Sequence, residues 1–168
     1  TINDDIISNV DFAPTILDFA GNKIPSDIQG KSFTGFFDDS INLNWRQSLY
    51  YRYWMHGAHF NIPGHYGIRT KDFKLIYFYA KGLGYSHERY YPSENWVYEG
   101  NEIKDSNDYW EMYDLRNDPN ELNNIYDNPN YKKIKEELKN QLFDLKKYYK
   151  DTDESFPELY TITKKYSD

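Results

Sequence analysis

Residues 64–79 read Gly-His-Tyr-Gly-Ile-Arg-Thr-Lys-Asp-Phe-Lys-Leu-Ile-Tyr-Phe-Tyr, and they carry the strongest strand signal in the chain. Two runs rich in aromatic and β-branched residues, 65–70 and 73–79, flank Lys71-Asp72, a pattern typical of a β-hairpin with a two-residue turn. The second run is apolar over most of its length, which predicts a central strand covered on both faces. We therefore expect the hairpin to form the middle of a sheet.

Further strands are expected before and after this hairpin. Residues 47–55 and 109–115 are rich in aromatic residues and favour extended structure. After the second of these strands, Asp118-Pro119-Asn120-Glu121 has the N-cap, N1 proline and N3 acid of a short helical turn.

The strongest helical pattern begins at Asn128. Asn128 is a candidate N-cap, and Pro129 fits the first helical position. Apolar residues then recur at steps of three and four, at Tyr131, Ile134, Leu138, Leu142, Leu145 and Tyr149. This amphipathic helix and the strands predict an α+β fold, in which a small antiparallel sheet is packed by a long C-terminal helix.

A shorter helix is expected over residues 11–20. Asp11 is a candidate N-cap, Pro14 lies in the first turn, and Gly21 fits the C′ position. One face of this helix is apolar, with Phe12, Ile16 and Phe19.

Composition excludes several classes of protein. The aromatic residues, 18 Tyr, 10 Phe and 4 Trp, supply enough apolar surface for a folded core. A net charge of −7 without a dominant basic patch argues against nucleic acid as a partner. The chain has no cysteine for a disulfide or thiolate site, and no apolar run long enough for a transmembrane helix. It starts without Met or a signal peptide, so we expect the sequence to begin inside a longer protein, with any targeting signal upstream.

Three segments in order resemble the formylglycine-dependent sulfatases of the alkaline phosphatase superfamily, and in particular their N-sulphoglucosamine sulphohydrolase-like C-terminal domain. The first segment is Ser-Asn-Val-Asp-Phe-Ala-Pro-Thr-Ile-Leu-Asp-Phe-Ala-Gly at 8–21, followed by Gln-Gly-Lys-Ser-Phe at 29–33. The second is the start of the hairpin, and the third is Trp-Glu-Met-Tyr-Asp-Leu-Arg-Asn-Asp-Pro-Asn-Glu-Leu-Asn-Asn at 110–124. The resemblance covers about residues 8–150.

The resemblance implies three parts of the chain. Residues 1–40 would be the end of a truncated α/β catalytic domain, including its last helix. Residues 41–150 would form the C-terminal subdomain, and residues 151–168 a polar tail. The apolar face of the first helix should then lack a full partner within this chain.

The resemblance also implies hydrolysis of sulfate esters, with sulfated glycans as the favoured substrates. The family nucleophile becomes formylglycine within a Cys/Ser-x-Pro-x-Arg motif, which this chain lacks; Ser155-Phe-Pro-Glu-Leu159 has Leu where Arg is required. We therefore expect no catalytic residue here, with formylglycine, the Ca²⁺ ligands and the N-terminal catalytic domain all outside the chain. Export to the periplasm or the extracellular space is expected from the family.

Four residues are candidates for substrate binding. His65 matches the family motif and opens a strand after a Pro-Gly bend, but a hydrogen bond to a loop carbonyl would also explain it. His59 precedes it in a predicted loop. Arg69 could bind an anionic group, although an ion pair is the simpler interpretation. Trp54 could stack on a sugar, although a position in the core is the simpler interpretation.

Two alternatives stay open. His56, His59 and His65 lie within ten residues, but no carboxylate is spaced among them, so no metal site is expected. The chain could also be a non-catalytic carbohydrate-binding or accessory module.

Overall fold

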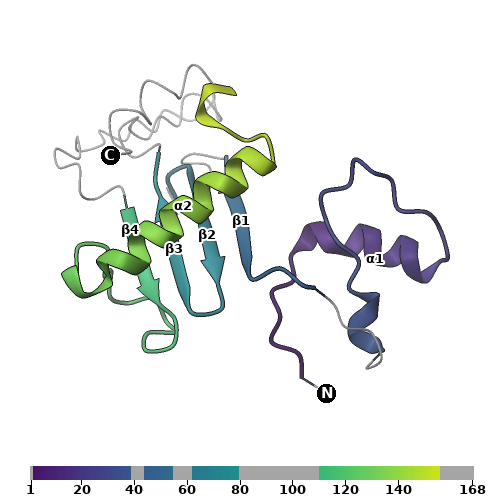
Figure 1. Cartoon of the computed structure of the whole chain (residues 1–168), viewed down its shortest axis with the longest axis horizontal. Helices are drawn as coiled ribbons and strands as arrows, with labels where there is room; N and C mark the ends of the chain where they lie inside the picture. Colours follow the sequence, from purple (N-terminus) through teal and green to yellow (C-terminus); the bar gives the residue numbers. More distant parts are fainter. Residues whose placement is uncertain (1, 39–43, 55–61, 80–109, 156–168) are drawn as a thin grey trace, which may run out of the picture. The chain divides into compact units, whose positions relative to one another are not determined.

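The computed structural model describes residues 2–38, 44–54, 62–79 and 110–155 (Figure 1). The chain divides into two compact units, Thr1–Leu49 and Tyr50–Asp168. The expected end of a catalytic domain near residue 40 stays a prediction. No helix in the described ranges is both long enough and apolar enough to cross a membrane.

A sheet of four strands in the order β1-β2-β3-β4 forms the centre of the second unit. The strands are β1 (Ser48–Tyr53), β2 (His65–Thr70), β3 (Phe73–Tyr77) and β4 (Trp110–Asp114). Strand β3 is antiparallel to both of its neighbours, pairing Arg69 with Lys74 on one side and Phe73 with Asp114 on the other. The predicted hairpin is confirmed, and its turn is closed by a hydrogen bond from the Phe73 amide to Thr70 Oγ1 at 2.9 Å.

Helix α2 (Lys132–Tyr148) crosses one face of this sheet, as Figure 1 shows. A 3₁₀ turn, Pro129–Tyr131, leads into the helix. The Asn128 side chain accepts a hydrogen bond from the Asn130 amide at 3.0 Å, which confirms the predicted cap. The α+β prediction is therefore correct for the sheet and its helix.

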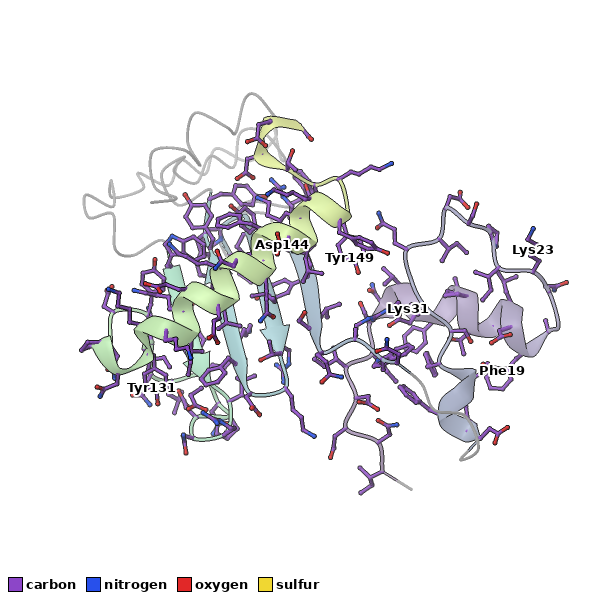
Figure 2. The ribbon with its side chains drawn as sticks, viewed as in Figure 1. Phe19, Lys23, Lys31, Tyr131, Asp144 and Tyr149 are labelled. Atoms are coloured by element: carbon purple, nitrogen blue, oxygen red, sulfur yellow. The ribbon has the colours of Figure 1, made fainter. Side chains whose placement is uncertain are left out.

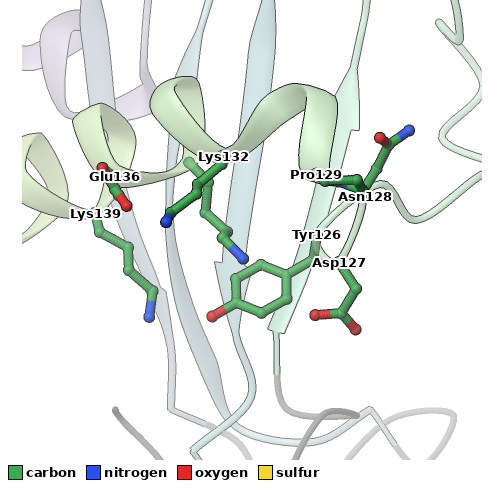
Figure 3. Close-up of a pocket in the computed structure, with 8 residues that line it drawn as sticks. Tyr126, Asp127, Asn128, Pro129, Lys132, Glu136 and Lys139 are labelled. Atoms are coloured by element: carbon green, nitrogen blue, oxygen red, sulfur yellow. The ribbon is translucent and has the colours of Figure 1, made fainter.

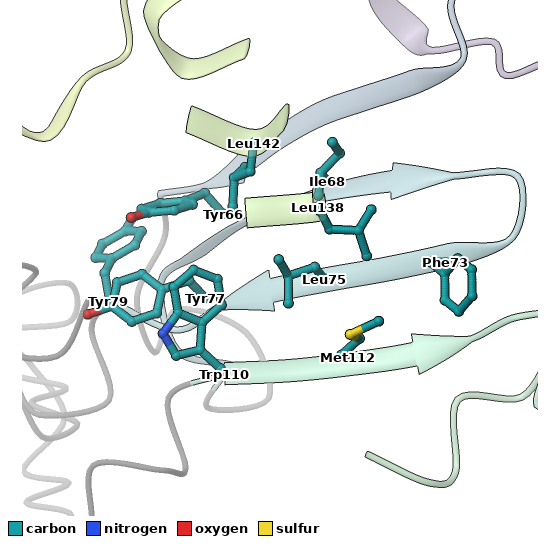
Figure 4. Packing of buried hydrophobic residues seen from close by; sticks show 10 residues of the cluster. All are labelled: Tyr66, Ile68, Phe73, Leu75, Tyr77, Tyr79, Trp110, Met112, Leu138 and Leu142. Atoms are coloured by element: carbon teal, nitrogen blue, oxygen red, sulfur yellow. The ribbon is translucent and has the colours of Figure 1, made fainter. Parts of the chain in front are cut away.

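The core lies between α2 and the sheet (Figure 4). Alternate residues of the central strands point toward the helix because side chains of a strand alternate between faces. The buried cluster consists of Tyr66, Ile68, Phe73, Leu75, Tyr77, Tyr79, Trp110, Met112, Leu138 and Leu142. Its aromatic content bears out the core expected from composition.

Buried ion pairs fix the residues that follow α2. Lys146, whose side chain is only 3% exposed, contacts Asp153 Oδ1 at 2.5 Å. Arg52 Nη1 lies 2.6 Å from Asp151 Oδ1, and the Tyr50 hydroxyl donates to the same carboxylate. The first residues of the predicted polar tail are thereby attached to the sheet and helix.

The 110–124 motif stabilises the edge of the sheet. Asn124 Oδ1 accepts from the Met112 amide at 3.0 Å, and Asn124 Nδ2 donates to the Trp110 carbonyl at 3.1 Å. Asp114 accepts both the backbone and the side-chain N–H groups of Arg116. The two bonds of Asn124 occupy backbone groups of β4 that an edge strand would otherwise expose.

The predicted helical turn at residues 118–121 is wrong. The Glu121 amide bonds to the Asp118 carbonyl at 3.1 Å, which closes a β-turn. Glu121 then adopts a left-handed φ of 56°, and a right-handed helix cannot continue through that conformation.

The first unit contains α1 (Phe12–Phe19) after a 3₁₀ turn at Asn9–Asp11, and a second 3₁₀ turn at Thr34–Phe37. Asp11 occupies the N-cap position of α1, as predicted, but its side chain makes no cap hydrogen bond to the helix. Its buried carboxylate instead accepts from the Ser8 and Lys31 amides, both at 2.8 Å, and pairs with Arg46. Gly21 ends the helix with a φ of 68°, as the sequence predicted.

Gly30 explains why the 29–33 segment accompanies this helix. A Cβ at Gly30 would lie 1.9 Å from the Val10 carbonyl oxygen, so only glycine allows the two backbones to approach. The adjacent Lys31 amide then reaches Asp11.

Among the residues that the structure describes, the apolar side of α1 has no full partner, as predicted. Phe12, Ile16 and Phe19 are 54%, 68% and 65% exposed. Figure 2 labels Phe19 on this helix. Phe37, 71% exposed, contacts Phe19 with ring centroids 5.7 Å apart and extends the same apolar surface.

Candidate functional site

The sheet face opposite α2 carries two of the four predicted site residues. His65 and Arg69 alternate along β2 with Tyr66 and Ile68, which are buried under the helix. Lys74 pairs with Arg69 across the hairpin and shares its face. We call His65, Arg69, Lys74 and Tyr51 the open-face cluster.

His65 is held at the start of β2 by rings and one hydrogen bond. Its imidazole stacks on Tyr53 with centroids 5.3 Å apart and contacts Phe78 at 5.1 Å. Nδ1 lies 2.8 Å from the Pro63 carbonyl oxygen. The loop-carbonyl alternative is thus observed, and the ring is half-buried rather than enclosed in the core.

Burial lowers the pKa of His65 below its usual value, and the nearby positive charge of Lys74 acts in the same direction. The imidazole is therefore neutral near pH 7. Because a carbonyl oxygen only accepts hydrogen bonds, the proton is on Nδ1 and Nε2 is an acceptor. Within the described part of the chain, Nε2 has no hydrogen-bond partner.

Tyr51 lies beside His65, with ring centroids 6.1 Å apart. Its ring occupies the space above Gly67, where a Cβ would lie 2.6 Å from the Tyr51 hydroxyl oxygen. That hydroxyl is buried and has no hydrogen-bond partner among the described residues. Burial raises the pKa of Tyr51, so the group stays a neutral donor.

Arg69 and Lys74 share one carboxylate. Lys74 Nζ lies 2.6 Å from Glu121 Oε2, while Arg69 Nη1 lies 3.9 Å from Glu121 Oε1. The ion-pair alternative is therefore observed for both cations. Arg69 is the looser partner, with a side chain 49% exposed.

Trp54 is exposed, contrary to the core position that its aromatic neighbours suggested. The residue is 46% exposed, and the guanidinium of Arg52 lies 3.7 Å from its ring centroid. Arg52 itself is almost fully buried and paired with Asp151. The indole is therefore supported by a fixed cation.

His59 and His56 lie outside the described residues. In the part of the chain that is described, no three His, Cys, Asp or Glu side chains form a group that could hold a metal ion. Together with the missing Cys/Ser-x-Pro-x-Arg motif, this means that these residues do not fit formylglycine or a Ca²⁺ site.

Two contributors to the site were missed at the level of sequence. Glu121 reaches the open face because its backbone is left-handed. That conformation is typical of glycine or asparagine, so a glutamate at this position does not predict it. Tyr51 looked like one more aromatic strand residue, yet its ring contacts His65 and its hydroxyl lies over Gly67.

Comparison with known sequences gives consistent matches. The family described as N-sulphoglucosamine sulphohydrolase, C-terminal, matches residues 1–99 and 98–148. An N-acetylglucosamine-6-O-sulfatase of Bacteroides thetaiotaomicron is 42% identical over 150 residues, which cover 88% of this chain and 22% of that protein. An ulvan-active sulfatase of Formosa agariphila is 30% identical, with 82% of this chain and 28% of that protein covered. The chain thus spans less than a third of these relatives.

Solved structures share the fold. One protein in complex with its substrate D-glucosamine-2-N, 6-O-disulfate matches with a TM-score of 0.65 and 41% identity, covering 86% of this chain and 25% of that chain. A phosphonate monoester hydrolase of Agrobacterium radiobacter matches at 17% identity with a TM-score of 0.55, covering 83% of this chain and 24% of that one. The second match concerns the fold alone.

Proposed function

This chain belongs to the N-sulphoglucosamine sulphohydrolase C-terminal family, and from that membership we propose that it is the C-terminal part of a sulfatase that hydrolyses sulfate esters of glycans. The observation that carries this proposal is the 42% identity to an N-acetylglucosamine-6-O-sulfatase over 88% of the chain. We propose glucosamine carrying a 6-O-sulfate as the substrate class, since that relative and the substrate-bound structure both concern sulfated glucosamine.

The proposed contribution of this chain is binding of the sugar rather than bond cleavage. The nucleophile and the Ca²⁺ that stabilises the transferred sulfate would belong to the catalytic domain, because the residues here fit neither group. Contacts far from the reacting sulfur position the ester and so lower the barrier.

The open-face cluster supplies suitable contacts. Neutral His65 presents Nε2 as an acceptor for a sugar hydroxyl, and the ring of Tyr51 packs beside it. Arg69 is loosely paired and has donors for a sulfate oxygen. Trp54 presents an exposed indole on which a sugar ring could stack, and His59 is proposed as a further contact.

We further propose that residues 1–40 complete the catalytic domain. The exposed face of Phe12, Ile16, Phe19 and Phe37 is the observation that supports this role. Its occupant would be the rest of the same sulfatase, since the relatives are more than three times longer than this chain's match to them. Export to the periplasm or the extracellular space is proposed because glycan substrates lie there.

The test compares two proteins in a sulfate-release assay with glucosamine 6-sulfate. We expect release by a protein in which this chain follows a Cys/Ser-x-Pro-x-Arg segment, and no release by the 168-residue chain alone. Release by the chain alone would overturn the division of roles. Binding of the sugar without release by the longer protein would instead favour an accessory carbohydrate-binding module.

A further inference from the structure

A hollow of about 420 Å³ opens at the start of α2, on the helix side of the sheet (Figure 3). It is lined on one side by residues 126–129, which precede the helix. On the other side it is lined by four residues of α2: Lys132, Lys135, Glu136 and Lys139. His65 points from the opposite face of the sheet, so this hollow is separate from the open-face cluster.

Three lysines converge on the hollow because they lie three and four residues apart along α2. The ammonium of Lys135 is 4.2 Å from the ring centroid of Tyr126, and that of Lys139 is 4.4 Å from the ring of Trp110. An ammonium has three N–H donors, so a contact with a ring face leaves it able to donate to an anion as well.

The rings of Trp110 and Tyr126 support the side chains of Lys135 and Lys139. Trp110 and Tyr126 are stacked, with centroids 5.7 Å apart and planes only 4° from parallel. Trp110 is 2% exposed, and its Nε1–H has no partner in the described part of the chain. Side chains that rest on a fixed aromatic surface lose less conformational entropy when a ligand binds.

The hollow also contains two carboxylates, those of Asp127 and Glu136. These groups would repel a small inorganic anion but accept hydrogen bonds from hydroxyl groups. Cations, hydroxyl acceptors and an aromatic ring in one hollow match a ligand that carries sulfate, hydroxyls and apolar C–H groups together. A sulfated sugar has that combination.

We propose that this hollow is a second binding site for sulfated glycans, separate from the open-face cluster on the other face of the sheet. Lys132, Lys135 and Lys139 bind sulfate groups, while Asp127 and Glu136 accept sugar hydroxyls. The choice of glycan as ligand rests on the proposed function, but the site does not depend on catalysis. Two sites on one protein hold a polymeric substrate more tightly than either alone.

The test measures binding of a heparin-derived hexasaccharide to the 168-residue chain by titration calorimetry at low salt. We expect Lys135→Gln/Lys139→Gln to weaken binding by about tenfold or more, because two charge-assisted contacts to sulfate are lost. The matched control is Lys133→Gln/Lys147→Gln, which removes the same charge from exposed positions of α2 outside the hollow. We expect the control to change affinity less than about twofold.

Two further arms make the outcome decisive. Lys135→Arg/Lys139→Arg keeps the charge, and it should keep most of the binding even if the glutamine variant is less stable. The desulfated hexasaccharide and inorganic sulfate should both bind much more weakly than the sulfated probe. Equal weakening by the two glutamine pairs, or equal binding of the desulfated sugar, overturns the proposal. The variants should still release sulfate from a monosaccharide in the longer protein, so failure here differs from failure of the proposed function.

Discussion

The imidazole of His65 donates its Nδ1–H to the carbonyl oxygen of Pro63, 2.8 Å away. This bond fixes the tautomer and leaves Nε2 as the atom available to a ligand. Since burial lowers the pKa of His65, the ring is an acceptor near neutral pH rather than a cation. The proposed contact is therefore to a sugar hydroxyl, and not to the sulfate itself.

Two substitutions of His65 separate its structural bond from its ligand contact. The amide nitrogen of His65→Asn can replace Nδ1 in the bond to Pro63, but it has no atom at the position of Nε2. We expect this variant to keep its stability and to lose about tenfold in kcat/KM in the longer sulfatase. His65→Gln, which reaches toward the Nε2 position, should keep more activity. Wild-type kcat/KM in the asparagine variant would show that His65 is only structural.

The lowered pKa of His65 predicts a dependence of stability on pH. The unfolded chain has the ordinary histidine pKa of 6.5, so it binds more protons than the folded state just below that pH. The free energy of unfolding should therefore fall as the pH drops from 6.5 toward the folded pKa. Urea unfolding at several pH values measures this effect, and His65→Asn should show a smaller slope. An unchanged slope would assign the effect to other groups.

Removal of Lys146 should destabilise the second unit strongly. Its ammonium is buried against Asp153 and lies 3.6 Å from the ring centroid of Tyr66. We expect Lys146→Met to cost about 3 kcal/mol, because Asp153 then keeps an unpaired charge near the core. The double variant Lys146→Met/Asp153→Asn should recover much of that loss. Urea unfolding of the wild type, the two single variants and the double variant completes this double-mutant cycle. If the two single losses simply add in the double variant, Lys146 and Asp153 are not coupled.

The Asp11–Arg46 pair should control the first unit. Burial alone would raise the pKa of Asp11, but hydrogen bonds from Arg46, Lys31 and Ser8 lower it. Arg46→Leu leaves the buried carboxylate short of its main partner, so we expect faster amide hydrogen exchange throughout α1. Exchange in β2 and β3 should change little, which serves as the internal control. Unchanged protection of α1 would contradict this role.

The exposed face of α1 gives a prediction about the missing partner. In the 168-residue chain, Ile16→Ser should change the free energy of unfolding by less than about 0.5 kcal/mol, because Ile16 is 68% exposed. In the longer sulfatase the same change should cost about 1–3 kcal/mol, since the side chain would be buried there. Leu122→Ser changes another exposed aliphatic residue, and as the matched control it should be neutral in both proteins. If Ile16→Ser has the same effect in both proteins, this face of α1 is not buried against the rest of the sulfatase.

The sequence alone was sufficient for the parts of the fold with strong local patterns. The hairpin, its turn at Lys71-Asp72 and the cap at Asn128 were all predictable, because each depends on residues that are close in the chain. The turn at residues 118–121 was not, because its spacing also suits a helix and only the backbone of Glu121 decides between them.

The family, the α+β class and the position of His65 and Arg69 on one face of β2 all follow from the order and spacing of the residues. The partners of these side chains are known only from the folded chain. His65 contacts Pro63 and Tyr53, Arg69 pairs with Glu121, and the exposed Trp54 packs against Arg52. The physical reason is that periodicity and capping are set by neighbours within a few residues. The ion pair of Arg69 with Glu121 and the ring contact of His65 with Tyr53 instead join separate segments of the chain, and their spacing leaves no local pattern.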